Sequence, residues 1–134
     1  MSGAIEVTAP RPMVAVVDDD AVCRRLVELV LKRGGYDVRT FESGDAFVAD
    51  VSGLSYACVV LDLSMPGLNG LDVQILLNER GTPTPVIFLS AEADPHTAAA
   101  VIRNGAADMI QKPVDPDTLV EKVREVVTLA RLAA

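Results

Sequence analysis

The sequence contains few aromatic residues, one histidine and two cysteines. Aromatic side chains make up 4% of its 134 residues and tryptophan is absent, so its core must be aliphatic. Cys23 and Cys58 show neither a metal-ligand spacing nor a secreted context, and we expect both to be reduced thiols. His96 stands beside Pro95 in a predicted first helical turn, where we expect neither a phosphohistidine nor a general base.

Positive charge is also scarce, with 12 Lys and Arg against 19 Asp and Glu and a net charge of −7. The densest basic groups, Arg24-Arg25 and Lys32-Arg33, are expected on the solvated face of one helix. Because phosphate contacts need clustered Lys and Arg, direct nucleic-acid binding by this chain is not expected. No apolar stretch reaches the length of a membrane span or a signal peptide, and we expect a cytoplasmic protein without membrane association.

Half of the residues are hydrophobic, which is enough for one domain of ordinary size. Residues 1–11, which include Pro10 and end just before Pro12, are predicted to form a flexible N-terminal arm. Residues 12–134 are predicted to form a single domain. Strands and helices alternate five times in that domain, which predicts a parallel sheet with helices on both faces. The predicted strands are residues 13–17, 36–41, 56–63, 86–89 and 109–112, and the predicted helices are 21–33, 43–51, 70–80, 95–103 and 116 to beyond 129.

Two of these helices carry recognisable apolar residues. The first has Val22, Leu26, Leu29 and Val30 at helical spacing, and the third is expected to turn Leu71, Ile75 and Leu76 inward. Four residues are expected to cap helix N-termini. They are Asp20, Asn69, Asp94 and Asp115.

Polar side chains stand where the predicted strands end. Asp18 and Asp19 follow the first strand, Asp62 ends the third, Ser90 the fourth and Lys112 the fifth. In open parallel sheets the carboxyl ends of the strands share one edge, and ligands bind beyond it. These side chains are therefore expected to form one site.

Three carboxylates at one site need a partner charge. Two unit charges about 4 Å apart repel by roughly 4 kcal/mol at an effective dielectric of about 20. Oxygen ligands alone favour Mg²⁺ over zinc, and with Lys112 the formal charges cancel. Asp62 is then the best candidate for a carboxylate nucleophile that forms an aspartyl-phosphate. The sequence has no GxxxxGK[ST] or GxGxxG motif, so the phosphoryl donor is not expected to be bound ATP.

Four motifs in order carry a family resemblance: residues 16–20 (VVDDD), 61–70 (LDLSMPGLNG), 88–91 (FLSA) and 112–113 (KP). On the basis of these motifs, the chain from about residue 12 to about residue 130 resembles the CheY-like receiver domain of response regulators in two-component signalling. Residues 88–113 look most like FixJ-type receivers. The resemblance implies an α/β, doubly wound, flavodoxin-like fold with five helices and a five-stranded parallel sheet of order 2-1-3-4-5.

The resemblance also implies roles for the site residues. Asp62 would accept a phosphoryl group from a phosphohistidine on a sensor histidine kinase or phosphotransfer protein, and the switch would change binding to a downstream protein. Asp19, Asp62 and the backbone carbonyl of Ser64 would bind Mg²⁺, with Asp18 acting through water. Ser90 and Lys112 would contact the phosphoryl group, and the Lys112–Pro113 bond would be cis. Met109 stands where the family usually has a switching Tyr or Phe, which puts the usual readout near the last strand in doubt.

The sequence is compatible with three functions. The leading one is a receiver that acts alone, without an output domain, as a phosphoacceptor and not an enzyme. The second is the N-terminal receiver fragment of a DNA-binding transcription regulator. The third is an aspartyl-nucleophile phosphatase, which usually has a second Asp two residues beyond the nucleophile. Ser64 occupies that position and counts against it.

Overall fold

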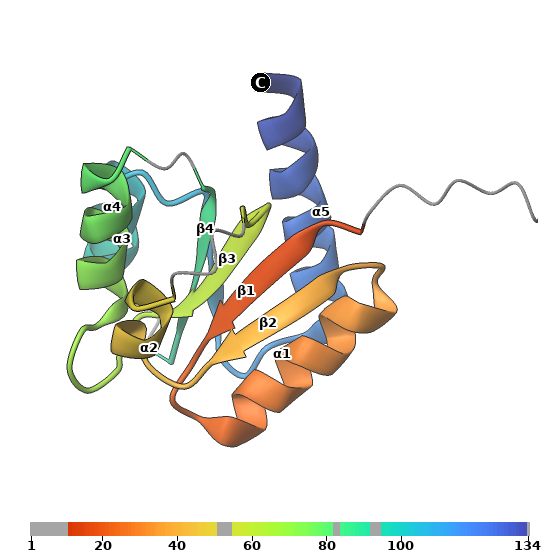
Figure 1. Ribbon diagram of the computed structural model, residues 1–134, viewed down its shortest axis with the longest axis horizontal. Coiled ribbons are helices and arrows are strands. Elements are labelled where there is room, and N and C mark those ends of the chain that lie inside the picture. Colours follow the sequence, from red (N-terminus) through yellow and green to blue (C-terminus); the bar gives the residue numbers. More distant parts are fainter. Residues whose placement is uncertain (1–10, 51–54, 82–83, 92–94, 134) are drawn as a thin grey trace, which may run out of the picture.

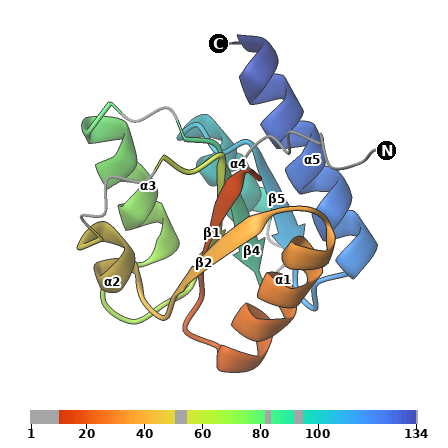
Figure 2. The same cartoon turned by 45° about the vertical axis from the view of Figure 1, so that its right-hand side comes forward.

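The computed structural model describes residues 11–50, 55–81, 84–91 and 95–133, which form one sheet flanked by helices (Figures 1 and 2). All strand pairs are parallel, and the strand order is β2-β1-β3-β4-β5. This confirms the predicted fold class and strand order. The elements are β1 (Met13–Val17), α1 (Ala21–Arg33), β2 (Asp37–Phe41), α2 (Gly44–Val48), β3 (Cys58–Asp62), α3 (Gly70–Glu79), β4 (Val86–Ser90), α4 (Pro95–Arg103), β5 (Asp108–Gln111) and α5 (Pro116–Ala133).

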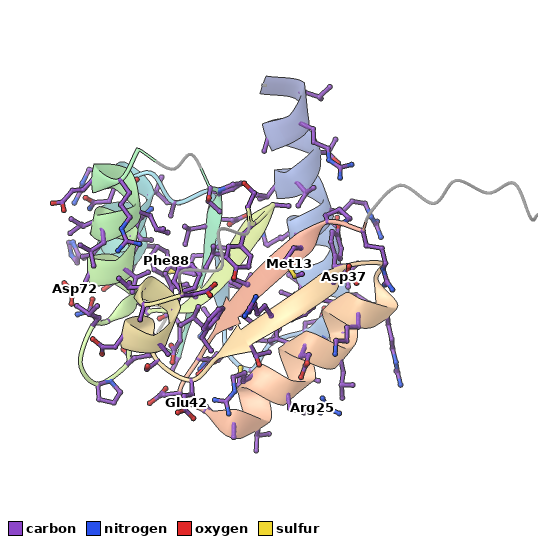
Figure 3. All side chains as sticks on the ribbon, in the orientation of Figure 1. Met13, Arg25, Asp37, Glu42, Asp72 and Phe88 are labelled. Carbon is purple, nitrogen blue, oxygen red and sulfur yellow. The ribbon has the colours of Figure 1, made fainter. Side chains whose placement is uncertain are left out.

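The sheet separates two aliphatic clusters, because successive side chains of a strand point to opposite faces. Val14 and Val16 of β1 pack with α1 and α5, whereas Ala15 and Val17 pack with α2, α3 and α4. Phe88 belongs to the second cluster and lies between the sheet and α3 (Figure 3). The central strands β3 and β4 are buried at every residue, as expected for a parallel sheet covered on both sides.

Three of the four predicted caps are present. Asp20 accepts hydrogen bonds from the N–H groups of Val22 and Cys23 at the start of α1. Asn69 and Asp72 form a reciprocal capping box on α3, and the Asp115 carboxylate accepts from the Thr118 N–H at the start of α5. Asp94 lies outside the described residues. These caps set where each helix begins relative to the strand before it.

The inward face of α1 differs from the one suggested by the sequence. Val22, Leu26 and Leu29 are 80%, 39% and 41% exposed, whereas Val27 and Leu31 are fully buried. Val30, which belonged to the predicted set, is partly buried against the first cluster. Apolar residues occur on more than one side of this helix, so their spacing fits two rotations about its axis. Packing against β1 and α5 selects the rotation that buries Val27 and Leu31.

The third helix shows the same kind of difference. Val73 and Gln74 are its buried side chains, whereas Ile75, expected to face inward, is 40% exposed. Leu71 and Leu76 are only partly buried. The buried face is therefore formed by Gly70, Val73 and Gln74 and not by the predicted stripe.

Several element boundaries also differ. The second helix was predicted from 43 to 51 but covers Gly44–Val48, with Ser43 as its N-cap. The last strand ends at Gln111, which leaves Lys112 just beyond it. Arg11, the last residue of the predicted arm, donates hydrogen bonds to the carbonyls of Lys32 and Gly35 at the end of α1. Within the described ranges no helix is both long and apolar enough to cross a bilayer.

The start of α3 packs tightly against the end of β3. A Cβ atom on Gly70 would lie 2.5 Å from the Asp62 carbonyl oxygen and 2.8 Å from Phe88 Cε1. We therefore expect Gly70→Ala to lower the free energy of unfolding by about 1–3 kcal/mol, as overpacking of a dense interior does. Urea denaturation monitored by circular dichroism measures this change.

Gly34→Ala is the matched control. A Cβ on Gly34 would meet no atom closer than 3.4 Å, and this residue has ordinary helical backbone angles (φ −77°). Its unfolding free energy is expected to change by less than about 1 kcal/mol. Equal losses in both variants would contradict the close-packing explanation for Gly70.

Candidate functional site

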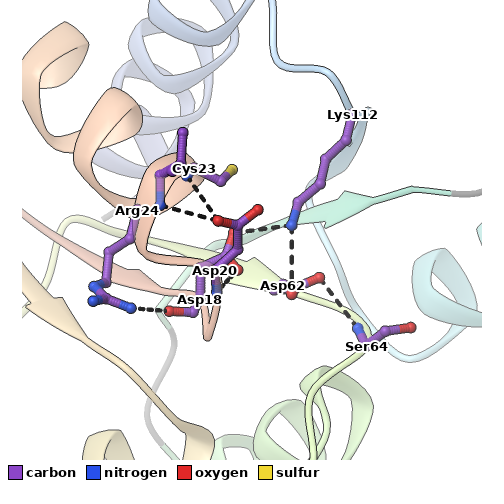
Figure 4. Close-up of polar contacts among 8 residues, drawn as sticks. Asp18, Asp20, Cys23, Arg24, Asp62, Ser64 and Lys112 are labelled. Carbon is purple, nitrogen blue, oxygen red and sulfur yellow. Dashed lines mark hydrogen bonds and ion pairs between the residues drawn. The ribbon is translucent and has the colours of Figure 1, made fainter.

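The carboxyl ends of the strands bring the predicted polar residues together. Asp18, Asp62 and Ser90 are buried, with 0%, 4% and 6% of their surfaces exposed. Lys112 follows β5 and reaches across the opening, so that its Nζ atom lies 3.1 Å from Asp18 Oδ2 and 3.5 Å from Asp62 Oδ2 (Figure 4). The four side chains come from four different strand ends that meet only in the folded protein.

The loop between β1 and α1 presents the acidic side chains. The Asp18 N–H donates to the carbonyl of Phe41 on β2, and the Asp20 N–H donates to Asp18 Oδ1 at 2.9 Å. Asp20 thus serves as the helix cap and supplies only its backbone to this network. Asp19 is exposed, yet one of its carboxylate oxygens lies within 4.8 Å of oxygens of both Asp18 and Asp62.

These oxygens fit a hard divalent cation. The cluster of Asp18, Asp19 and Asp62 offers only carboxylate oxygen, which is the donor type that Mg²⁺ prefers. Asp18 Oδ2 is buried, and among the described residues no donor meets hydrogen-bond geometry toward it despite the nearby Lys112 charge. A buried carboxylate oxygen without a hydrogen bond is costly, and a cation would satisfy it.

Ser64 contacts the Asp62 carboxylate oxygen that does not face Lys112. Its N–H donates to Asp62 Oδ1 at 3.2 Å, which holds the loop after β3 close to the carboxylate (Figure 4). The remaining Asp62 oxygen, Oδ2, faces Lys112. One oxygen of Asp62 is therefore fixed by the backbone, and the other faces a positive charge.

The two buried carboxyl groups differ in pKa. Burial raises the pKa of Asp62 to about 6, helped by the neighbouring charge of Asp18. Burial alone would also raise the pKa of Asp18, but the hydrogen bond from the Asp20 N–H, the nearby Cys23 thiol and the charge of Lys112 outweigh it, and the pKa of Asp18 is lowered. Asp18 is thus the anion that Lys112 neutralises, and Asp62 is the carboxyl left with an unfavourable charge.

Ser90 and Met109 lie on the same side of the sheet. Phe88 pairs with Met109 and Ser90 pairs with Gln111, so Ser90, two residues after Phe88, points to the face that Met109 also occupies. Met109 is partly buried against the cluster under α2, α3 and α4. The Lys112–Pro113 peptide bond is cis.

Two residues near the site were not identified from the sequence as part of it. Arg24, expected on a solvated face, is half-buried, and its Nη1 atom donates to the Asp18 carbonyl oxygen at 2.7 Å. Cys23 is a half-buried free thiol beside Asp18, and burial together with the charge of Asp18 raises the pKa of Cys23 to about 12. The Arg24 contact spans six residues, a separation that helical periodicity does not reveal.

The comparisons with known proteins identify the family. The model of the response regulator receiver domain matches residues 14–124, so the chain belongs to this family. The sequence is 42% identical over 119 residues to the transcriptional regulatory protein TdiR of Thauera aromatica, covering 88% of this chain and 52% of TdiR. It is 32% identical over 119 residues to the transcriptional regulatory protein FixJ of Bradyrhizobium diazoefficiens, covering 89% of this chain and 58% of FixJ. The chain thus spans about half the length of these curated relatives.

Solved structures show the same relationship. The signal receiver domain of a putative LuxO repressor protein from Vibrio parahaemolyticus superposes with a TM-score of 0.86 at 29% identity, covering 92% of this chain and 95% of that one. The chemotaxis protein CheY4 of Vibrio cholerae superposes with a TM-score of 0.81 at 25% identity, covering 87% and 98%. The predicted resemblance to receiver domains is confirmed.

Replacing Asp62 by Asn is expected to stabilise the metal-free protein near neutral pH. The pKa of Asp62 is about 6 in the fold, against about 3.9 for Asp in an unfolded chain. Because folding raises this pKa, the folded protein binds a proton at Asp62 more tightly than the unfolded chain does. The stability that this proton binding adds is complete below about pH 4 and is lost as the pH rises through about 6. Asn carries no charge and avoids this loss, so Asp62→Asn should gain on the order of 1 kcal/mol or more at about pH 7.5.

Urea denaturation in the presence of a chelator, at about pH 4.5 and about pH 7.5, measures the effect. Asp117→Asn, an exposed carboxylate on α5, is the control and should show no such gain. The same difference between wild type and Asp62→Asn at both pH values would contradict the assigned pKa.

Proposed function

We propose that Asp62 is the phosphoacceptor of a Mg²⁺-dependent signalling switch, and that the phosphoryl donor is a phosphohistidine on a sensor histidine kinase or a phosphotransfer protein. The observation that carries the proposal is the meeting of Asp18, Asp19, Asp62 and Lys112 at one edge of the sheet. Membership in the receiver family supports it. In this proposal residues 12–134 are the receiver unit, residues 1–11 are an arm, and the protein works in the cytoplasm.

Each residue has a task that follows from its position. Asp19, Asp62 and the Ser64 carbonyl would hold Mg²⁺, with Asp18 contributing through water. When bound, the ion would neutralise negative charge on the carboxylates and on an incoming phosphoryl group. The Ser64 N–H fixes Asp62 Oδ1, so Oδ2, beside Lys112, is the oxygen available as nucleophile.

The transfer step needs no nucleotide. An oxygen of Asp62 forms a bond to phosphorus while the P–N bond of the donor breaks, and the electron pair of that bond stays on the departing imidazole nitrogen. Lys112 lies close enough to pair with the transferred phosphoryl oxygens, since its Nζ atom is 3.5 Å from Asp62 Oδ2. The product is an aspartyl-phosphate and a free histidine.

The readout is proposed to pass through β4 and β5. Ser90 turns toward the phosphoryl group, and Met109 on the same face of the sheet follows it. The thioether of Met109 is flexible and fills space well, so it supports repacking under α4 without presenting a ring or a hydroxyl to a partner. A downstream protein would then bind the phosphorylated form.

The output of the switch has two candidates. The sequence predicts a receiver that acts alone, by contact with its partner proteins. The alternative, the N-terminal receiver of a DNA-binding transcription regulator, is favoured by the names of TdiR and FixJ and by their greater length. The mass of the native protein separates them, because a regulator of that kind would be about twice as heavy.

Acetyl phosphate and Mg²⁺ should label the wild-type protein with one phosphoryl group and leave Asp62→Asn unlabelled, because an amide oxygen is a poor nucleophile. Intact-protein mass spectrometry measures the stoichiometry, and Asp117→Asn should label as the wild type does. Retained labelling of Asp62→Asn would refute the assignment. Turnover of many equivalents of acetyl phosphate would instead indicate the phosphatase alternative.

Lys112→Ala should still accept a phosphoryl group but should respond to it weakly. Lys112 is the cation that the proposal pairs with the phosphoryl group, and its loss leaves Ser90 and Met109 without that anchor. Amide chemical shifts of β5 and α4, recorded with and without beryllofluoride, measure the response. Lys122→Ala, which breaks the ion pair with Asp108 and leaves the contacts of Lys112 with Asp18 and Asp62 in place, is the control. A full response in Lys112→Ala would remove the role given to this lysine.

A further inference from the structure

Asp19 is the exposed member of the acidic cluster, and its own side chain does not hold it in place. In the described part of the chain its carboxylate makes no hydrogen bond or ion pair, whereas the carboxylates of Asp18 and Asp62 each have one hydrogen bond and one ion pair. The carboxylate nevertheless lies within 4.8 Å of oxygens of Asp18 and Asp62. Its position must therefore come from the backbone on either side of it.

Both peptide groups that flank Asp19 are anchored. The peptide after Asp19 is fixed by the Asp20 N–H, which donates to Asp18 Oδ1 at 2.9 Å. The peptide before Asp19 is fixed by the Asp18 carbonyl, which accepts from Arg24 Nη1 at 2.7 Å (Figure 4). A peptide group is planar, so a donor that holds the Asp18 carbonyl also fixes the direction in which the Asp19 Cα atom lies.

We propose that Arg24 is a positioning residue that orients Asp19 toward Asp18 and Asp62 for binding a divalent cation. Its guanidinium reaches from α1 across the β1–α1 loop to the one carbonyl that joins the two aspartates. The inference rests on the proposed function, because it assigns Arg24 a task in assembling the same cation site.

Because Arg24 is positively charged, any help that it gives to cation binding must come from orienting Asp19 and not from electrostatic attraction. A positive group near a cation site repels the cation, so charge alone would weaken binding. The hydrogen bond to the Asp18 carbonyl has the opposite effect, since a fixed Asp19 loses less conformational freedom when it binds. The two explanations therefore predict opposite signs when Arg24 is made neutral.

Calorimetric titration with MgCl₂ at constant ionic strength measures whether a neutral residue in place of Arg24 weakens or strengthens Mg²⁺ binding. Arg24→Met removes the donor and the charge while keeping a long side chain, and its Mg²⁺ dissociation constant should rise about tenfold, as for other residues that orient metal ligands. Arg24→Lys keeps a charged donor of different shape and should fall between wild type and Arg24→Met. Wild-type or tighter binding by Arg24→Met overturns the proposal.

Arg25 supplies the matched control. It is the next residue of α1, lies on the outer side of the helix (Figure 3) and pairs with Glu28 at 3.0 Å. Arg25→Met removes the same charge without touching the Asp18 carbonyl, so its Mg²⁺ affinity should stay within about twofold of wild type. An equal weakening in both variants would show that Arg24 has no special task.

A readout without metal keeps the proposal testable if the site binds another ion. Amide exchange of Asp20, measured by NMR in a chelator, should be several-fold faster in Arg24→Met than in wild type or Arg25→Met, because the loop loses one of its two anchors. Unchanged exchange overturns the proposal. Thermal unfolding, recorded in parallel, separates loop loosening from a global loss of stability.

The outcomes also distinguish this inference from the proposed function. If wild-type protein binds Mg²⁺ and accepts a phosphoryl group while Arg24→Met does both equally well at limiting Mg²⁺, only the role of Arg24 fails. If wild-type protein does neither, the proposed function fails, and the amide exchange still decides whether Arg24 holds the loop. At saturating Mg²⁺ the labelling rate of Arg24→Met should return to within about twofold of wild type.

Discussion

The repulsion between two buried carboxylates is the constraint around which this protein is arranged. Asp18 and Asp62 end neighbouring strands and both approach the same lysine, at 3.1 and 3.5 Å. One lysine neutralises one carboxylate, so the second charge must be removed by a proton or a cation. The raised pKa of Asp62 expresses this cost in the metal-free protein. The strand ends, the loop contacts and Lys112 all serve to hold an arrangement that the charges themselves oppose.

The site was largely predictable because it depends on strand ends. The buried runs of β1, β3 and β4 have an unmistakable aliphatic pattern, and in a parallel sheet their carboxyl ends share one edge. The structure brings Asp18, Asp19, Asp62 and Lys112 together there, as expected. The caps at Asp20 and Asn69 were predictable for a similar reason, since capping depends on residues only two or three positions apart.

What escaped prediction depends on tertiary packing. The α1 helix has apolar residues on more than one side, and only its contacts with the sheet and α5 decide that Val27 and Leu31 are buried and Val22 is not. Arg24 contacts a carbonyl six residues earlier across a loop, and no repeat in the sequence marks such a contact. Gln74 is another such case, because nothing in its spacing marks a polar residue that is 2% exposed.

The close junction between β3 and α3 has a mechanical consequence. The Gly70 N–H donates to the Leu63 carbonyl, and the Gly70 Cα atom leaves no room for even a methyl group beside the Asp62 carbonyl. The space between the end of β3 and the start of α3 is therefore filled. A displacement of the Asp62 backbone would be transmitted directly to the first turn of α3, because no free volume between the two elements can absorb it.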